Sequence, residues 1–288
     1  MIPKRMAFFW VGRMSWMRWL TLSTFVKFNP DWEILLYTAD SKMVLPKHWI
    51  GEPDDDNTYK GPDYMDRLPS SVQVREFYPP QPMGAAQICD LFQWKFLATE
   101  GGFYADMDIL WLKPFESTYA QCKNDDAVFC LEGDILAIGL VGSSPECPVF
   151  KAIYDAAVVE PNRDYQHYGT NLVYRMFGIR SAETPAPGLK VLNLFRQLYP
   201  DVPITEIPPE TVYTFIWNEA AKIFHQDRRV TSRAVGIHWF GGGSISDRWN
   251  CLLTEGSWRK HFNTFTRCLR SIDFDKSHVG ISTTAVAS

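Results

Sequence analysis

Residues 6–38, "MAFFWVGRMSWMRWLTLSTFVKFNPDWEILLYT", decide the fold class of this chain. The stretch opens with a short apolar run of the kind that forms a buried parallel strand. Residues 15–28 then space large apolar side chains as a helix does, and Asn29-Pro30 ends the predicted helix. A second buried strand is predicted over 32–38. Strand, helix and strand with short connections indicate a mostly parallel sheet flanked by helices, and hence an α/β fold.

The rest of the chain continues this alternation after a polar interruption. Residues 40–82 are rich in Pro, Gly, Asp and Ser without a sustained period, which predicts a functional loop or a flap. The further helices are predicted over 84–102, 145–158, 165–177 and 256–271, and the further strands over 127–131, 136–142 and 233–240. Residues 282–288 read as a frayed tail.

Composition excludes several classes of protein. The chain is 46% hydrophobic and 22% charged, as expected of a folded chain with a sizeable core, and its formal charge of -4 argues against a nucleic-acid partner. No apolar run is long enough for a transmembrane segment. The six cysteines form no CxxC pair, so we expect free thiols in a reducing compartment, the cytoplasm.

The pair Asp106 and Asp108 carries the strongest chemical signal. It follows Gly101-Gly102, and in a strand both carboxylates would face the same side because side chains repeat every two residues. Adjacent carboxylates repel each other unless a cation lies between them, and an oxygen-rich site suits Mg²⁺ or Mn²⁺. The other Asp-x-Asp patterns, 54–56 and 273–275, follow no buried element and are predicted to lie on the surface.

The surrounding stretch, "ICDLFQWKFLATEGGFYADMDILWLKPF" (88–115), resembles the signature of the DxD-sugar-binding glycosyltransferases. That group includes Och1-like mannosyltransferases and capsular polysaccharide sugar transferases, with the clostridial glucosylating toxins as distant relatives. The matching residues are Asp90, Gly101, Gly102, Tyr104, Asp106 and Asp108. The resemblance implies one GT-A domain with a single Rossmann-like sheet over 1–275. Its nucleotide-binding half would be 1–115, its acceptor half 116–275, and 276–288 a flexible tail.

The resemblance also implies the chemistry. It predicts a retaining hexosyltransferase of polysaccharide biosynthesis, which moves a sugar from a UDP- or GDP-sugar to an acceptor hydroxyl on a glycan, with Mn²⁺ or Mg²⁺. Asp106 and Asp108 would be the catalytic acids, and both would bind the metal. The predicted nucleotide-sugar residues are Trp10, Val11, Asp90, Tyr104, Asp106, Gly242 and Trp249.

A second matching patch is "GIHWFGGGSISDRW" (236–249). His238 ends a predicted strand, where its imidazole would supply a third metal ligand. The glycines at 241–243 would let backbone N–H groups approach phosphate oxygens. We expect 241–249 to lack regular secondary structure and to become ordered when the donor binds.

Two positions depart from the family pattern. The family's Arg, three residues after the helix Asp, is Gln93 here, and Lys95, an Arg near residue 248 or a different donor geometry could replace it. On the acceptor side, Gly169 matches a Gly-Pro motif whose Pro is absent, which leaves Tyr168 and Asn171 as candidate acceptor residues.

Two alternatives come from other classes. A haloacid-dehalogenase-type phosphohydrolase also uses Asp-x-Asp with Mg²⁺, but it needs a strong strand before the pair, and "GGFYA" predicts a poor one. A non-catalytic carbohydrate-binding module is compatible with the 11 Trp and with Gln93. Both acids are retained in Asp-x-Asp, which favours the enzyme, because binding alone needs no paired metal acids.

Overall fold

The computed structural model describes residues 1–45, 59–160, 167–179 and 188–274. Its centre is a seven-stranded sheet in the order β10-β8-β9-β6-β1-β2-β4, in which β9 alone runs antiparallel to its neighbours. The strands are β1 (Arg5–Phe9), β2 (Glu33–Thr38), β4 (Val72–Glu76), β6 (Gly102–Ala105), β8 (Ala127–Cys130), β9 (Leu140–Ser143) and β10 (Ile204–Ile207). The predicted α/β fold with a mostly parallel sheet is confirmed.

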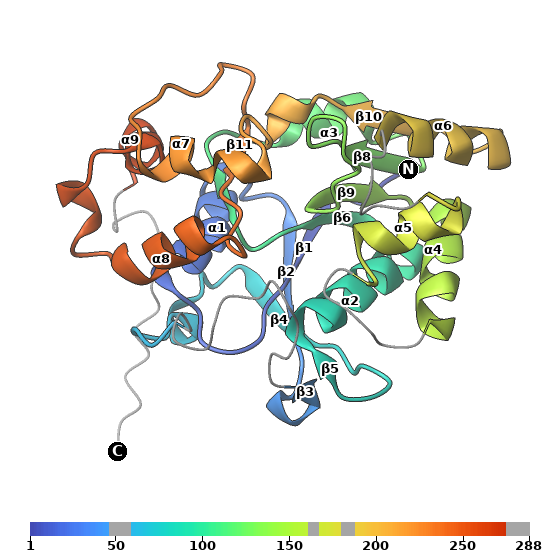
Figure 1. Cartoon of the computed structure of the whole chain (residues 1–288), viewed down its shortest axis with the longest axis horizontal. Helices are drawn as coiled ribbons and strands as arrows, with labels where there is room; N and C mark the ends of the chain where they lie inside the picture. Colours follow the sequence, from blue (N-terminus) through green and yellow to red (C-terminus); the bar gives the residue numbers. More distant parts are fainter. Residues whose placement is uncertain (46–58, 161–166, 180–187, 275–288) are drawn as a thin grey trace.

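Helices cover both faces of this sheet, with α1 on one side and α2 and α4 on the other (Figure 1). The helices are α1 (Trp16–Phe28), α2 (Ala85–Thr99), α3 (Glu116–Cys122), α4 (Pro148–Val159), α5 (Thr170–Met176), α6 (Gly188–Leu198), α7 (Ala220–Phe224), α8 (Ser244–Leu252) and α9 (Thr264–Ser271). Short strands form two further ladders: β3 (Val44–Leu45) with β5 (Met83–Gly84), and β7 (Ile109–Trp111) with β11 (Gly236–His238).

Alternation along β1 explains the two layers. Met6 and Phe8 pack into the core with α1 and α9, whereas Ala7 and Phe9 pack into the core with α2, α4, α5 and α6. Successive side chains of a strand point to opposite faces, so a continuous apolar run produces a strand buried on both sides. The structure thereby confirms the strand–helix–strand unit, and Ser15 caps α1 by accepting a hydrogen bond from the Arg18 N–H at 3.1 Å.

Two sequence expectations are wrong. The excursion over 40–82 contains β4, which extends the sheet beyond β2; its residues are mostly exposed, so the strand has little apolar pattern. "GGFYA" is not a poor strand, because β6 lies buried between β1 and β9. Gly102 has φ 109°, and a Cβ there would lie 2.3 Å from Arg5 Cγ, so the glycine permits close packing.

Several other predictions have a clear outcome. All six cysteines are free, as expected. No helix among the described residues has both the length and the apolar character needed to cross a bilayer. The acidic cluster 54–56, Asp275 and the tail 276–288 lie outside the described residues.

The arrangement of strands identifies one edge of the sheet for a site. From β1 the chain crosses to β2 on one side, while β6 pairs with β1 on the other side. In α/β sheets, ligands bind beyond the carboxyl ends of the strands where the order changes direction. Trp10 follows β1 and Asp106 follows β6, so both lie at this edge.

Candidate metal and donor site

Three side chains from two distant parts of the chain meet at this edge. Asp106 directly follows β6, Asp108 lies in the turn before β7, and His238 is the last residue of β11. The antiparallel pairing of β7 with β11 places His238 opposite Ile109, next in the chain to Asp108. The pairing of these two short strands therefore brings the imidazole to the carboxylates.

The three side chains are close enough to share one ion. His238 Nε2 lies 3.3 Å from Asp106 Oδ2 and 3.1 Å from Asp108 Oδ1. One ligand atom from each residue lies within 4.8 Å of the others. Asp108 and His238 are buried, and Asp106 is half-buried.

The carboxylates do not meet in the way that strand alternation predicts. Asp106 terminates β6, and Met107-Asp108 forms a turn before β7, so the two acids do not belong to one strand. The expectation that strand spacing alone aligns them is wrong. It is the turn between two strands that directs both carboxylates toward His238.

Asp106 is held by a hydrogen-bonded neighbour. Tyr104 Oη donates to Asp106 Oδ1 at 2.8 Å and lies 3.0 Å from Cys89 Sγ. Burial opposes ionisation of Asp106, but hydrogen bonds from His238 and Tyr104 outweigh burial and lower the pKa of Asp106. Burial likewise lowers the pKa of His238, but Asp108 and Asp106 outweigh it, and the net pKa of His238 is raised.

Asp108 uses its two oxygens differently. Oδ2 accepts a hydrogen bond from the Gly241 N–H at 2.6 Å and lies 3.6 Å from Arg18 Nη1. Oδ1 is buried and makes no hydrogen bond to any residue that the structure describes, although it faces His238. A buried carboxylate oxygen without a donor is costly, and a cation would satisfy it. The mixed set of two carboxylates and one imidazole therefore fits a divalent metal ion.

The predicted nucleotide-sugar residues separate into two groups. Tyr104 contacts Asp106 directly, whereas the Trp10 ring lies 4.8 Å from the Arg18 guanidinium, whose Nη1 is 3.6 Å from Asp108 Oδ2. Burial, and after it the charge of Asp106, raises the pKa of Asp90 well above its usual value.

The other three predicted donor residues have different surroundings. Val11 packs against the core on the α2 side, and Gly242 is exposed. The Trp249 ring stacks on Phe224 at 5.8 Å and meets the edge of His261 at 5.2 Å. The contacts of Val11 thus lie with the core on the α2 side, and those of Trp249 lie with Phe224 and His261.

The glycine-rich segment is more regular than expected. Arg248 and Trp249 lie on α8, which begins directly after Gly243, so the prediction that 241–249 lacks regular secondary structure is wrong. The sequence "SISDRW" is polar and follows three glycines. The buried residues of α8 are only Ser246 and Asn250, so the helix has no apolar stripe that would predict it. Ordering on donor binding stays a prediction.

The expected substitutes for the family's Arg have other roles. Gln93 is buried, and its Nε2 donates to the Ile138 carbonyl at 2.7 Å. Lys95 is exposed, with its Nζ 5.6 Å from the Phe77 ring, and Arg248 is exposed on α8.

Arg18 instead approaches the carboxylates, and sequence reasoning did not single it out. The only available signal was a charged residue in the apolar stretch 15–28. Tyr213 was also missed; its ring lies 5.2 Å from the His238 ring.

The candidate acceptor residues form part of the packing around α5. Tyr168 is buried, and its Oη donates to the Glu160 carbonyl at 3.0 Å. Thr170, which stands where relatives carry Pro, donates to the Leu136 carbonyl at 3.0 Å. A Cβ at Gly169 would lie 2.9 Å from Asp90 Oδ2, so this glycine lets the chain pass close to Asp90. Asn171 is half-buried.

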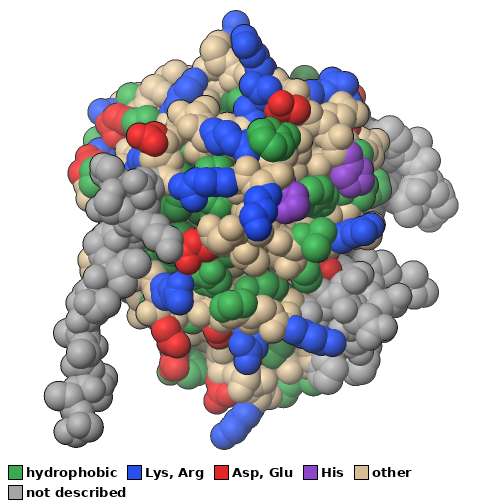
Figure 2. Space-filling model, turned by 90° about the vertical axis from the view of Figure 1, so that its left-hand side faces the viewer, with side chains coloured by type: hydrophobic (Ala, Val, Ile, Leu, Met, Phe, Trp, Pro, Cys, Tyr) green, Lys and Arg blue, Asp and Glu red, His purple; other side chains and the backbone are tan. Residues whose placement is uncertain are grey.

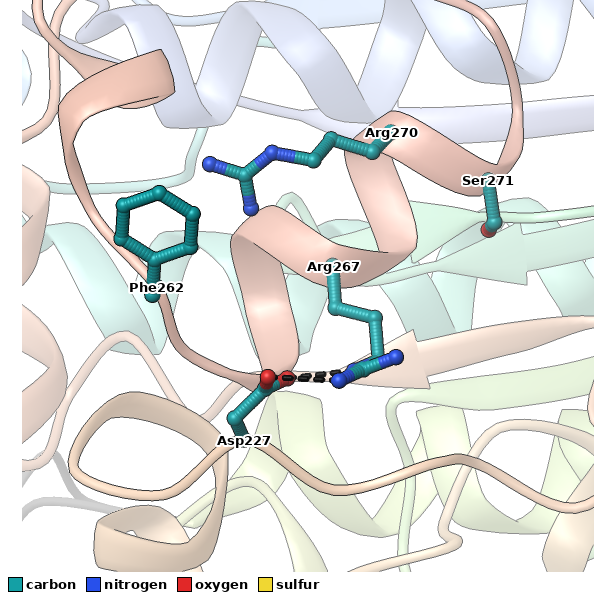
Figure 3. Close-up of a pocket in the computed structure, with 5 residues that line it drawn as sticks. All are labelled: Asp227, Phe262, Arg267, Arg270 and Ser271. Atoms are coloured by element: carbon teal, nitrogen blue, oxygen red, sulfur yellow. Dashed lines mark hydrogen bonds and ion pairs between the residues drawn. The ribbon is translucent and has the colours of Figure 1, made fainter.

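A separate hollow over α9 is not part of this site. Figure 3 shows Arg267 turned toward Asp227, with which it forms an ion pair, and Arg270 beside Phe262. Arg270 also donates to the His261 carbonyl at 2.7 Å. The face that carries α8 and α9 shows basic side chains scattered among apolar ones (Figure 2). Arg267 and Arg270 both already bind neighbouring groups of the protein, which indicates that they stabilise the packing of α9.

Part of the chain is similar to a known protein family. Residues 18–125 match the family described as "Glycosyltransferase sugar-binding region containing DXD motif". No curated protein matches the sequence. Among solved structures, the chain is similar to the PaToxG glycosyltransferase, with 18% identity, 69% of this chain and 74% of that chain covered, and a TM-score of 0.40.

Two further structures are similar to it. For the apo form of the glycosyltransferase GlyE of Streptococcus pneumoniae TIGR4 the identity is 12%, with 96% of this chain covered and a TM-score of 0.46. This chain spans 62% of the GlyE chain. For the galactosyltransferase LgtC in complex with donor and acceptor sugar analogs the identity is 10%, with 89% and 99% of the two chains covered and a TM-score of 0.41.

Proposed function

We propose that this chain, in which residues 18–125 match the glycosyltransferase family with the DXD motif, carries out a metal-dependent, retaining transfer of a sugar from a nucleoside diphosphate to an acceptor hydroxyl. One observation carries the proposal: ligand atoms of Asp106, Asp108 and His238 lie within 4.8 Å of one another, and the buried Asp108 Oδ1 has no hydrogen bond from the described part of the chain. A divalent cation, Mn²⁺ or Mg²⁺, held by these three residues would neutralise charge that develops on the departing diphosphate.

The chain's own residues keep the ligands in place. Tyr104 orients Asp106 through its 2.8 Å hydrogen bond, and the Gly241 N–H orients Asp108 at 2.6 Å. Hydrogen bonds to ligating carboxylates fix their direction and tune the affinity for the ion. This arrangement supports a catalytic site over the alternative of a non-catalytic carbohydrate-binding module, which needs no paired acids.

The donor would lie along the carboxyl ends of β1 and β6. Trp10 and Asp90 are proposed to contact the base and ribose, as part of the nucleotide-binding half 1–115, and the acceptor, a glycan hydroxyl, would approach from 116–275. We propose front-face displacement, with the leaving phosphate helping to deprotonate the acceptor. The six free cysteines support a reducing compartment, and we propose the cytoplasm.

A panel of nucleotide sugars tests this function. UDP-glucose, UDP-galactose, UDP-N-acetylglucosamine and GDP-mannose are each incubated with the protein, with Mn²⁺ or with EDTA, and release of UDP or GDP is measured. We expect turnover of one donor with Mn²⁺ and none with EDTA. Asp108→Asn should abolish this turnover. Asp273→Asn is the control, because Asp273 is the exposed first residue of the Asp-x-Asp pattern at 273–275, and it should leave turnover unchanged. Equal turnover in EDTA, or by Asp108→Asn, would overturn the proposal.

A further inference from the structure

Arg18 lies in an unusual position for an arginine. It belongs to the first turn of α1, and its guanidinium is held between two indole rings, 4.8 Å from the Trp10 centroid and 4.6 Å from the Trp239 centroid. The side chain is only 12% exposed. A planar guanidinium stacks well on aromatic faces, so the two rings fix its direction.

This fixed guanidinium points at the metal cluster. Arg18 Nη1 lies 3.6 Å from Asp108 Oδ2, beyond hydrogen-bond distance, while the buried Nε has no hydrogen-bond partner among the described residues. Gly241 packs against the same group, because a Cβ at Gly241 would lie 2.1 Å from Arg18 Nη2. Arg18 therefore retains unused hydrogen-bonding capacity next to the segment 241–243.

A buried guanidinium with so few hydrogen-bond partners is unfavourable unless another group compensates its charge. A cation removed from water is destabilising unless charges and hydrogen bonds satisfy it. Asp108 supplies one long ion pair, and that carboxylate is also the proposed ligand of a divalent ion. A diphosphate would supply the missing negative charge and acceptor oxygens, since phosphates bind arginine through paired hydrogen bonds.

We propose that Arg18 contacts the donor's diphosphate. A guanidinium on α1 would thereby take the role of the family's Arg, whose position on α2 is occupied by Gln93 in this chain. The inference rests on the proposed function, because it assumes a nucleoside diphosphate beside Asp108. Gln93 donates to a backbone carbonyl, and Lys95 is exposed beside Phe77, so neither is placed for this contact. The competing role for Arg18 is structural, as a cation that joins Trp10 to Trp239.

The test compares diphosphate, monophosphate and metal binding. Calorimetry measures the affinities of wild type, Arg18→Gln and Arg18→Lys for UDP, GDP, UMP and GMP with Mn²⁺, and for Mn²⁺ alone. Arg67→Gln is the matched control, because Arg67 also stacks on an aromatic ring (Tyr64, 5.1 Å) and pairs with a carboxylate (Glu255, 3.4 Å). Melting temperatures report the structural role.

We expect Arg18→Gln to weaken diphosphate binding by about tenfold to a hundredfold, the range for charge-assisted hydrogen bonds. Monophosphate binding should fall less, and Mn²⁺ alone should bind at least as tightly, because a nearby positive charge is removed. Arg18→Lys, which retains the charge and protects the fold, should retain part of the affinity. Arg67→Gln should match wild type.

Two results would overturn the inference while the proposed function stands. One is diphosphate affinity in Arg18→Gln equal to that of wild type. The other is an equal loss for diphosphate, monophosphate and Mn²⁺ that accompanies a lower melting temperature, which would make Arg18 structural. If wild type itself binds neither UDP nor GDP with Mn²⁺, the proposed function fails, and this inference fails with it.

Discussion

His238 Nε2 lies 3.1 Å from Asp108 Oδ1, although the two residues come from opposite halves of the chain. The antiparallel pairing of β7 with β11 produces this contact, because His238 stands opposite Ile109. His238 Nδ1, the other ring nitrogen, receives the Phe240 N–H at 3.3 Å, so Nε2 is the nitrogen that faces the carboxylates. The imidazole and the two acids thus form one unit whose geometry a three-residue ladder maintains.

Replacing His238 tests whether the imidazole belongs to the metal site. We expect His238→Gln to weaken Mn²⁺ binding by at least tenfold, because one of three protein ligands is exchanged for a poorer one. His225→Gln is the control, since His225 is exposed and its ring adjoins Trp249. Calorimetric titration of Mn²⁺ into each protein measures the effect. Unchanged affinity in His238→Gln would leave His238 as a buried structural residue.

Tyr104→Phe tests the residue that orients Asp106. The variant removes the 2.8 Å hydrogen bond to Oδ1 and keeps the ring, so the fold should persist while donor turnover falls about tenfold. Tyr78→Phe removes a comparable phenol–carboxylate hydrogen bond, to Glu76, on the exposed surface and should leave turnover unchanged. Steady-state release of nucleoside diphosphate is the readout. If Tyr104→Phe and Tyr78→Phe behave alike, Tyr104 does not support the site.

Gly139 approaches the cluster so closely that no side chain fits. A Cβ there would lie 2.5 Å from Asp106 Oδ2, 2.7 Å from Tyr213 Oη and 3.0 Å from His238 Nε2. Gly139→Ala should therefore displace the ligands and reduce Mn²⁺-dependent turnover by at least a hundredfold, with a stability loss of about 1–3 kcal/mol. Gly256→Ala, where a Cβ meets nothing within 4 Å, should do neither. Full activity of Gly139→Ala would show that the cluster tolerates rearrangement.

Asp90 predicts a dependence of stability on pH. Burial, followed by the charge of Asp106, raises the folded-state pKa of Asp90 well above its unfolded value of about 4. Its contribution to stability is therefore complete below the unfolded pKa and is lost as pH rises through the folded pKa. Asp90→Asn removes this ionisation, so the melting temperature of wild type should fall relative to that of Asp90→Asn as pH rises above the unfolded pKa of about 4.

The control for this prediction is Asp66→Asn, which alters an exposed carboxyl group. Its melting temperature should parallel that of wild type over the whole pH range. Donor binding supplies a second readout, because Asp90→Asn should weaken it if Asp90 contacts the ribose. A wild-type curve parallel to that of Asp90→Asn would mean that Asp90 ionises without cost in the folded protein.

The sequence predicted the parts of this molecule that depend on local pattern. The apolar runs around Phe8 and Leu35 and the helix end at Asn29-Pro30 predict strand–helix–strand, because burial on both faces leaves a continuous apolar run. Asp106 and Asp108 stand out for a similar reason, since two acids between apolar strands have no role in packing.

Contacts made by long-range packing could not be read in this way. Arg18 appears in the sequence as one of two charged residues in a largely apolar helix, and only the fold places it between Trp10 and Trp239. "GGFYA" predicts a poor strand, whereas in β6 the close approach of Gly102 to Arg5 requires a glycine. Whether the predicted residues bind metal and donor stays a prediction.

The position of a bound ion tests the central claim most directly. Crystals grown with Mn²⁺ and the nucleoside diphosphate of the active donor, measured at the manganese absorption edge, would locate the ion by its anomalous signal. The account predicts one strong peak within about 2.0–2.3 Å of an Asp108 oxygen and of His238 Nε2, with Asp106 beside it. No peak at the Asp106–Asp108–His238 cluster at saturating Mn²⁺, or a peak elsewhere in the protein, would contradict it.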